Sequence, residues 1–179
     1  MPDNDKFRGK YRIPSARWVA WDYGANAAYF VTICTAERAH GFGTIANGNM
    51  NLSLLGHAAL DCWHEIPNHF PFVELDEFVV MPNHVHGIVV INKPDSVETQ
   101  YFASLQKPKN TFGPQSQNLA SVIRGYKIGV TRFARQHNIQ FAWQARYHDH
   151  IIRSAVEQAR IQRYILTNPQ SWEKDINYR

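Results

Sequence analysis

Two short β-branched runs flank a Pro-Asn turn between Phe78 and Ile91, and this segment constrains the fold more than any other. Such a pattern predicts a strand, a tight turn and a second strand. Successive side chains of a strand point to opposite faces, so His84 and His86 share one face, roughly 6.5–7 Å apart along the chain. Two imidazoles placed in this way can bind one divalent ion. The alternative is a pair of half-exposed histidines without a ligand role.

The remaining patterns predict a β, α, β, β, α, β, α order. Apolar residues at helical spacing follow Ser53 and Asn118, which are suitable N-caps, and an Asn47-Gly48 turn predicts a small β-ribbon. We expect strands over 28–35, 73–80, 84–91 and 146–153, and helices over 53–66, 118–136 and 156–168, the first and last of these ended by Pro67 and Pro169. The fold class is therefore α+β: a ferredoxin-like βαββαβ antiparallel sheet with an additional C-terminal helix.

Composition bounds the class of protein. The 179 residues and their aromatic and aliphatic content suit one globular domain, expected over 28–179, after a basic N-terminal arm over 1–27. The polar segment 93–117 has no periodicity and is expected to be a flexible insertion. No apolar run reaches the length of a membrane span, no secretory signal is evident, and the two cysteines form no CxxC motif. We expect a cytoplasmic, nucleoid-associated protein without a membrane partner.

Basic residues gather at both ends of the chain, whereas acidic residues cluster in the middle. A basic surface on an aromatic-rich domain suits a polyanion such as nucleic acid, although an ordinary solvated surface is an equal alternative. The candidate DNA contacts are Arg8, Lys10, Arg12, Arg124, Lys127, Arg146, Tyr147, His150, Arg153, Arg160 and Arg163.

The last predicted helix carries Tyr164 and Asn168, which are four residues apart and share a helix face. A phenol with an ordinary pKa of about 10 is a poor nucleophile unless a metal or cations assist it. The amide oxygen of Asn168 is an acceptable third ligand for a hard divalent ion. The alternatives are a half-buried helix aromatic and a helix-terminal asparagine before proline. Tyr126 falls on the apolar stripe of its helix and is predicted to be a core residue.

Four motifs appear together and in a fixed order: residues 29–35 (YFVTICT), 75–87 (LDEFVVMPNHVHG), 143–153 (WQARYHDHIIR) and 163–169 (RYILTNP). In this combination the chain resembles the HUH single-tyrosine transposases of small bacterial insertion sequences. It is most similar to their domesticated relatives, the REP-associated tyrosine transposases, which act at repetitive extragenic palindromes. The resemblance spans about residues 21–172 and implies the same ferredoxin-like fold.

The resemblance also implies a reaction, because the family cuts single-stranded DNA through a covalent 5′-phosphotyrosine with a divalent metal. By position, His84 and His86 would be metal ligands, Asn168 the third ligand and Tyr164 the nucleophile. The cofactor would be Mg²⁺ or Mn²⁺, of which Mn²⁺ tolerates mixed nitrogen and oxygen ligands better. The expected partner is single-stranded DNA carrying a hairpin, bound by a monomer or a homodimer. Only His150 of the His148-Asp149-His150 trio fits the family pattern.

Two other functions stay open on the residues alone. One is a non-catalytic protein that binds single strands or hairpins on the same kind of sheet. The other is a metal-dependent nuclease that uses water, with Tyr164 purely structural. A protein–DNA adduct stable in SDS would distinguish the transposase chemistry from both.

Overall fold

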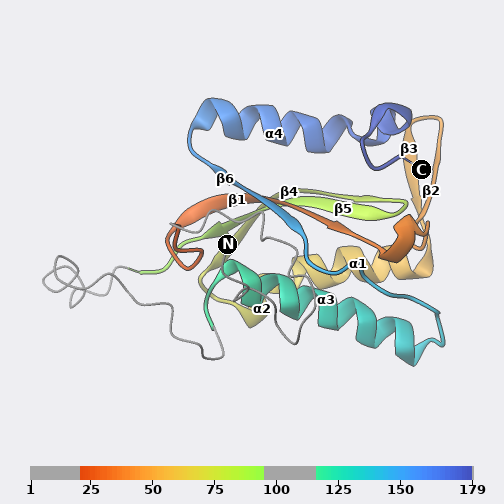
Figure 1. Ribbon diagram of the computed structural model, residues 1–179, viewed down its shortest axis with the longest axis horizontal. Helices are drawn as coiled ribbons and strands as arrows, with labels where there is room; N and C mark the ends of the chain where they lie inside the picture. The colour runs from red at the N-terminus through yellow and green to blue at the C-terminus, as the bar shows by residue number, and fades with distance from the viewer. Residues whose placement is uncertain (1–20, 95–115, 179) are drawn as a thin grey trace, which may run out of the picture.

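The computed structural model describes residues 21–94 and 116–178 (Figure 1). The candidate contacts Arg8, Lys10 and Arg12 of the N-terminal arm lie outside the described residues, as does most of the 93–117 segment.

Four antiparallel strands form the central sheet. They are β1 (Ala27–Cys34), β4 (Val73–Met81), β5 (His84–Ile91) and β6 (His148–Ile152), in the spatial order β4-β5-β1-β6. The first core strand thus pairs with the third and the fourth, as a ferredoxin-like βαββαβ unit requires. The expected fold class is confirmed. β5, which carries the two histidines, lies inside the sheet, whereas β6 is an edge strand.

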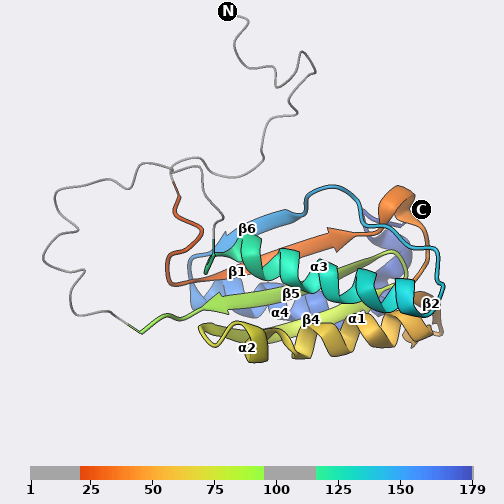
Figure 2. The ribbon, with the colours of Figure 1, turned by 90° about the horizontal axis from the view of Figure 1, so that it is seen from below.

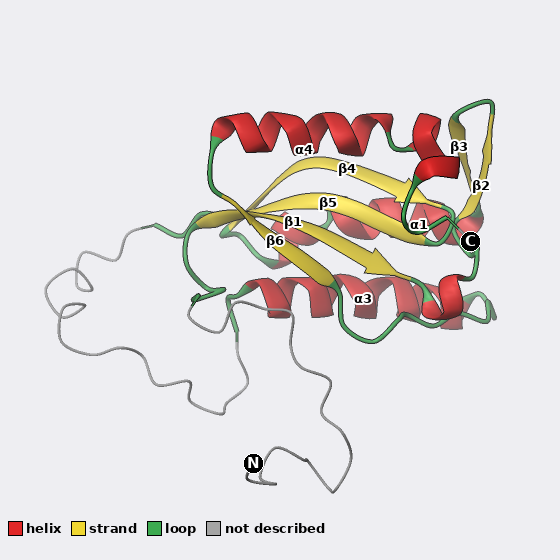
Figure 3. Ribbon diagram, turned by 45° about the horizontal axis from the view of Figure 1, so that its top comes forward, coloured by secondary structure: helices red, strands yellow, loops and turns green. Residues whose placement is uncertain are grey.

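Helices cover both faces of this sheet (Figures 1 and 3). On one face α1 (Leu54–His64) and α3 (Leu119–Gln136) pack side by side, with the short α2 (Ile66–His69) beyond α1 (Figure 2). On the other face lies α4 (Ala155–Thr167), followed by the 3₁₀ helix η3 (Pro169–Lys174). A separate ribbon of β2 (Gly43–Ala46) and β3 (Asn49–Leu52) turns at the expected Asn47-Gly48, and a 3₁₀ turn η2 (Ala36–Arg38) follows β1.

Local sequence signals set most helix boundaries. The side chains of Ser53, Asn118 and Ser154 each accept a backbone N–H three residues on, which caps α1, α3 and α4. The prediction that Pro67 ends the first helix was wrong in detail. α1 ends at His64, and Pro67 lies in the first turn of α2, where its missing N–H costs no helical hydrogen bond.

Alternation along β5 divides its side chains between the two faces, as the sequence predicted. Val85 and Val89 enter the main hydrophobic core beneath α1 and α3, whereas His84 and His86 face α4. Gly87 lies under the ring of Trp63, and a Cβ there would come within 2.3 Å of that ring. Trp63 can therefore pack flat over β5, where it stacks on Phe78 at 4.3 Å between centroids.

Candidate active site

The two β5 histidines meet on the face of the sheet that α4 covers. Both are buried, with exposed fractions of 0% for His84 and 2% for His86. Their Nε2 atoms lie 2.9 Å apart. Two nitrogen ligands of one ion at about 2.1 Å and a right angle would be about 3 Å apart, so this spacing fits shared coordination.

Hydrogen bonds to the other ring nitrogens fix the orientation of both imidazoles. His84 Nδ1 lies 2.8 Å from Asn83 Oδ1, and the Asn83 amide nitrogen donates to a backbone oxygen, which leaves Oδ1 as the acceptor. His86 Nδ1 lies 2.8 Å from the hydroxyl of Thr32 on β1. A proton on each Nδ1 leaves the Nε2 lone pairs facing one another, which is the arrangement that metal-bound histidines commonly have.

Electrostatics keep these rings neutral. Burial, followed by the neighbouring imidazole of His86, lowers the pKa of His84 to about 2. Burial also lowers the pKa of His86, although Asp175 opposes the shift. Neutral imidazoles are the form that binds metal ions.

Tyr164 reaches this histidine pair from α4. Its hydroxyl lies 3.2 Å from His86 Nε2, and its side chain is 40% exposed, so a substrate can reach it. The Phe30 ring stacks on His86 and contacts Tyr164 edge-on, which helps to hold both rings. Burial and the nearby Asp175 carboxylate raise the pKa of Tyr164 above its ordinary value. The phenol is therefore protonated until positive charge or a base assists it.

Asp175 is a site residue that sequence reasoning missed. It follows η3, and its side chain is 1% exposed. Its Oδ2 accepts hydrogen bonds from the Tyr164 hydroxyl at 3.0 Å and the Asn168 amide at 2.7 Å, and lies 3.9 Å from His86 Nε2. His84, His86 and Asp175 each offer a ligand atom, and these atoms lie within 4.8 Å of one another.

Asn168, the predicted third ligand, lies beside Asp175 at the end of α4. Its amide nitrogen donates to Asp175, which fixes the orientation of the amide. Its Oδ1 is buried and has no hydrogen-bond partner among the described residues. A buried, unpaired amide oxygen on a residue hydrogen-bonded to the Asp175 carboxylate fits the donor set of a divalent ion.

A curated protein of Haemophilus influenzae is 38% identical to this chain over 171 residues, which cover 95% of each protein. The two chains belong to one family. The Haemophilus member is described only as an uncharacterized protein, so the family relationship brings no activity with it. No model of a known protein family matches the chain.

One solved structure shares the fold over most of the chain. It is a REP-associated tyrosine transposase bound to a REP hairpin, with a TM-score of 0.55 and 18% identity over 90% of this chain and 74% of the transposase. The ferredoxin-like fold that the resemblance to these transposases implied is therefore confirmed.

The predicted DNA contacts within the described residues fall into two groups. Around the start of α4, His150 Nε2 lies 2.8 Å from Glu157, whose carboxylate also accepts the backbone N–H of Arg153 and lies 3.9 Å from Arg160. Arg163 is exposed on α4. A second group lines a groove beside α3, behind the sheet: Arg124, Lys127, Arg146 and Tyr147.

Tyr126 lies in the core, as predicted, with an exposed fraction of 2%. Among the described residues, no helix is both long and apolar enough to cross a membrane.

Proposed function

We propose that this protein cleaves and rejoins single-stranded or hairpin DNA through a covalent 5′-phosphotyrosine on Tyr164. One observation carries the proposal: the Tyr164 hydroxyl lies 3.2 Å from a buried imidazole nitrogen, beside a possible His84–His86–Asp175 metal-binding cluster. The same-fold transposase was solved with a REP hairpin, which supports hairpin DNA as the class of substrate.

The residues of this chain suggest how the step would balance. The Tyr164 oxygen attacks the scissile phosphorus, and an O–P bond forms as the bond to the 3′ oxygen breaks. The Asp175 carboxylate, which accepts the hydrogen bond from the Tyr164 hydroxyl at 3.0 Å, would orient that hydroxyl. The phenolic proton is lost to water, and the departing 3′ oxygen takes up a proton from water. The downstream strand stays on Tyr164 as a phosphodiester. Attack by another 3′-OH would release Tyr164 and rejoin DNA without an external energy source.

His84, His86, Asp175 and the unpaired oxygen of Asn168 would hold a divalent ion, Mg²⁺ or Mn²⁺. The chemistry that such an ion supplies is positive charge, which stabilises a phosphorane-like transition state and favours the phenolate. Two imidazole nitrogens in the donor set favour Mn²⁺ over Mg²⁺. Because Tyr164 reaches the histidines of its own chain, a monomer is sufficient for this proposal.

Labelled hairpin oligonucleotides with single-stranded flanks test the reaction directly. With Mn²⁺ present, a 3′-labelled strand should give a labelled protein band that survives SDS, whereas a 5′-labelled strand should give a shorter free fragment. Tyr164→Phe should bind the same DNA and form no adduct, because only the attacking oxygen is removed. Cut DNA without an adduct would support a water-using nuclease, and binding without cutting would support a non-catalytic hairpin-binding protein.

A further inference from the structure

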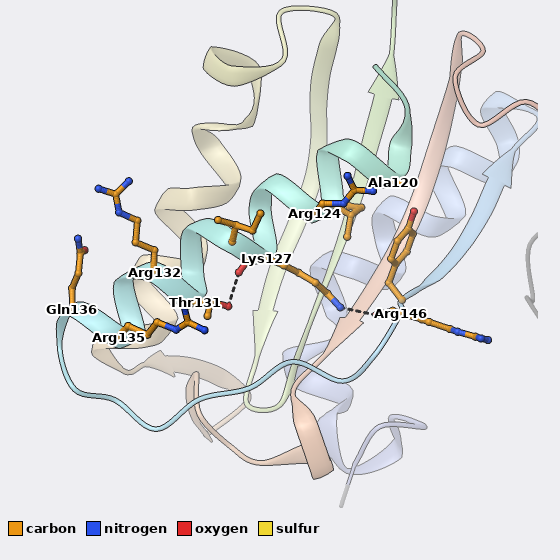
Figure 4. A pocket seen from close by; sticks show the side chains of 11 residues that line it. Ala120, Arg124, Lys127, Thr131, Arg132, Arg135, Gln136 and Arg146 are labelled. Carbon is orange, nitrogen blue, oxygen red and sulfur yellow. Dashed lines mark hydrogen bonds between the residues drawn. The ribbon is translucent and has the colours of Figure 1, made fainter. Parts of the chain in front are cut away.

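A groove of about 600 Å³ runs along α3, on the opposite side of the sheet from Tyr164. Its walls are the exposed face of α3 and the segment that leads into β6 (Figure 4). We call it the α3 groove and define it by Arg124, Lys127, Arg132, Arg135, Arg146 and Tyr147.

The charge of this groove has one sign. None of the described residues that line it is acidic, and α3 contains three arginines and one lysine but no aspartate or glutamate. Arg124, Arg132 and Arg135 are exposed, and the ion pairs among the described residues lie elsewhere. A solvated helix face normally mixes both signs, so an unbalanced row of arginines indicates a polyanionic ligand.

Lys127 holds one wall of the groove in place. Its ammonium donates to the backbone oxygens of Gln144 at 2.9 Å and Arg146 at 2.7 Å, and lies 5.6 Å from the centre of the Trp143 ring. These contacts hold the segment before β6 against α3 and keep Arg146 beside the groove (Figure 4). Lys127 is therefore a positioning residue, and the three exposed arginines of α3, Arg124, Arg132 and Arg135, are the candidate contacts.

The spacing of the arginines suits a phosphate backbone. Arg124 and Arg135 are eleven residues apart on one helix, or about 16 Å along its axis. Duplex DNA carries one negative charge per about 1.7 Å of its axis, so a row of this length faces several phosphates. Proteins that bind single strands add aromatic platforms for the bases, whereas Tyr147 is the only aromatic side chain lining this groove in residues 21–94 and 116–178. Backbone contact with a duplex is the better match.

We propose that the α3 groove binds the sugar-phosphate backbone of the duplex stem of hairpin DNA. This inference rests on the proposed function, because it assigns a separate place to the stem of that substrate. The single-stranded flank would then pass the edge strand β6 and reach Tyr164 on the other face. Each face of the sheet would bind a different part of one DNA molecule.

The test compares two variants of equal net charge. Arg124→Gln, Arg132→Gln and Arg135→Gln together remove three positive charges from the groove. The control combines His57→Glu, His64→Glu and His69→Glu, which adds three negative charges at exposed positions of α1 and α2. Both are measured against a hairpin with its flank and against the flank alone, over a range of salt concentrations, after thermal melting has shown that each variant is folded.

We expect the groove variant to bind the hairpin at least about tenfold more weakly than the control does at 0.15 M salt. The slope of log affinity against log salt should become shallower by about 0.9 for each phosphate that the groove no longer neutralises. Affinity for the flank alone should match the control. A hairpin affinity within twofold of the control, or an equal weakening on hairpin and flank, would overturn the groove assignment.

The two proposals fail in different ways. Parent protein that forms no adduct, but loses hairpin affinity when the groove is neutralised, would overturn strand transfer and support the groove. An adduct that forms normally, with hairpin affinity unchanged in the groove variant, would support strand transfer and overturn the groove.

Discussion

The helices on the two faces of the sheet are held by different kinds of contact. Beneath α1 and α3, a continuous core buries twenty residues completely or nearly so, among them Trp63, Tyr126 and Val130. Beneath α4 the buried apolar cluster consists of Ile88, Ile152, Ile161 and Ile165. The same face also holds the buried polar residues His84, His86 and Asn168, together with Asp175. The face covered by α1 and α3 thus provides most of the apolar packing that stabilises the fold. The face covered by α4 has polar groups where apolar side chains could have packed.

Polar contacts partly replace apolar packing under α4. Leu75 pairs with Val89 and Phe78 with Gly87, so a β-bulge sets Asp76 and Glu77 opposite one residue of β5. Asp76 accepts hydrogen bonds from Gln158 and Gln162 of α4 at 2.7–2.9 Å. The helix that carries Tyr164 is therefore tied to an edge strand by a carboxylate. Substitutions on the two faces should therefore separate effects on activity from effects on stability.

The largest expected effect lies on the polar face. His84→Ala or His86→Ala should abolish cleavage and adduct formation, because each removes an imidazole from the ligand set and leaves the α3 groove intact. Hairpin affinity, measured without metal, should stay within a few fold of the parent. Full cleavage activity in both variants would contradict the assignment of His84 and His86 as metal ligands.

The apolar face offers the matching test of stability. Trp63→Ala removes a fully buried ring that stacks on Phe78, and should lower the free energy of unfolding by about 3–5 kcal/mol. Leu166→Ala, at a position 59% exposed on α4, should change it by less than about 0.5 kcal/mol. Denaturant titrations of both variants measure the contrast. Equal losses would mean that α4 contributes to the core as much as α1 does.

Asp175→Asn tests whether the Asp175 carboxylate, which was not predicted from the sequence, contributes to metal binding. The amide keeps the size of the side chain but removes the negative charge that faces His86 and Tyr164. Affinity for Mn²⁺, measured by calorimetry, should fall by at least about tenfold. Adduct formation at a fixed metal concentration should fall with it, whereas folding should change little. A variant that binds Mn²⁺ and cleaves as well as the parent would exclude Asp175 from the site.

Asp175 shows where sequence reasoning stopped. The His84/His86 and Tyr164/Asn168 pairs could be predicted because strand and helix periodicity place them without knowledge of the tertiary fold. The tail after Trp172 has no such periodicity. Its path depends on tertiary contacts: the Trp172 ring packs against His84, and Asn177 bonds to Arg38 and Asn83. No local pattern of a short polar segment could have revealed these contacts.

The basic residues show the same limit. Arg124 and Lys127 were both predicted DNA contacts, and Arg124 is exposed on α3. Lys127 is half-buried and holds the segment before β6, because that segment folds back onto α3. Arg132 and Arg135 belong to the α3 groove but were not among the predicted contacts. Charge can be counted from a sequence, whereas its distribution between two faces requires the fold.

A smaller effect is expected at the β-bulge. Asp76→Ala removes the acceptor that ties α4 to β4 and should slow adduct formation several fold, because Tyr164 is positioned less often. Burial raises the pKa of Asp76, but hydrogen bonds from Gln158, Gln162 and the Glu77 N–H outweigh it and leave the pKa lowered. The stabilising contribution of Asp76 is therefore present above an ordinary aspartate pKa of about 4 and is lost as pH falls below it.

Single-turnover rates and pH-dependent melting measure the Asp76 effect. Glu77→Ala, at the same bulge, is the control, because Glu77 makes no hydrogen bond to α4 among the described contacts. If both variants slow the reaction equally, the bulge rather than the carboxylate positions the helix.

The smallest expected effect comes from the tyrosine on the apolar face. Tyr126 is 2% exposed, and its hydroxyl has no hydrogen-bond partner among the described residues. Burial raises its pKa well above the ordinary value, so the phenolate is not accessible. An unpaired buried hydroxyl costs about 1–3 kcal/mol, and Tyr126→Phe removes it while keeping the ring against Trp63 and Trp143. Adduct formation should match the parent, and stability should be unchanged or higher by up to about 1 kcal/mol.

The same change at Tyr164 deletes a hydroxyl bonded to Asp175 and should abolish the adduct with little effect on folding. An adduct that survives in Tyr164→Phe and vanishes in Tyr126→Phe would place the chemistry behind the sheet and reverse the roles of its two faces.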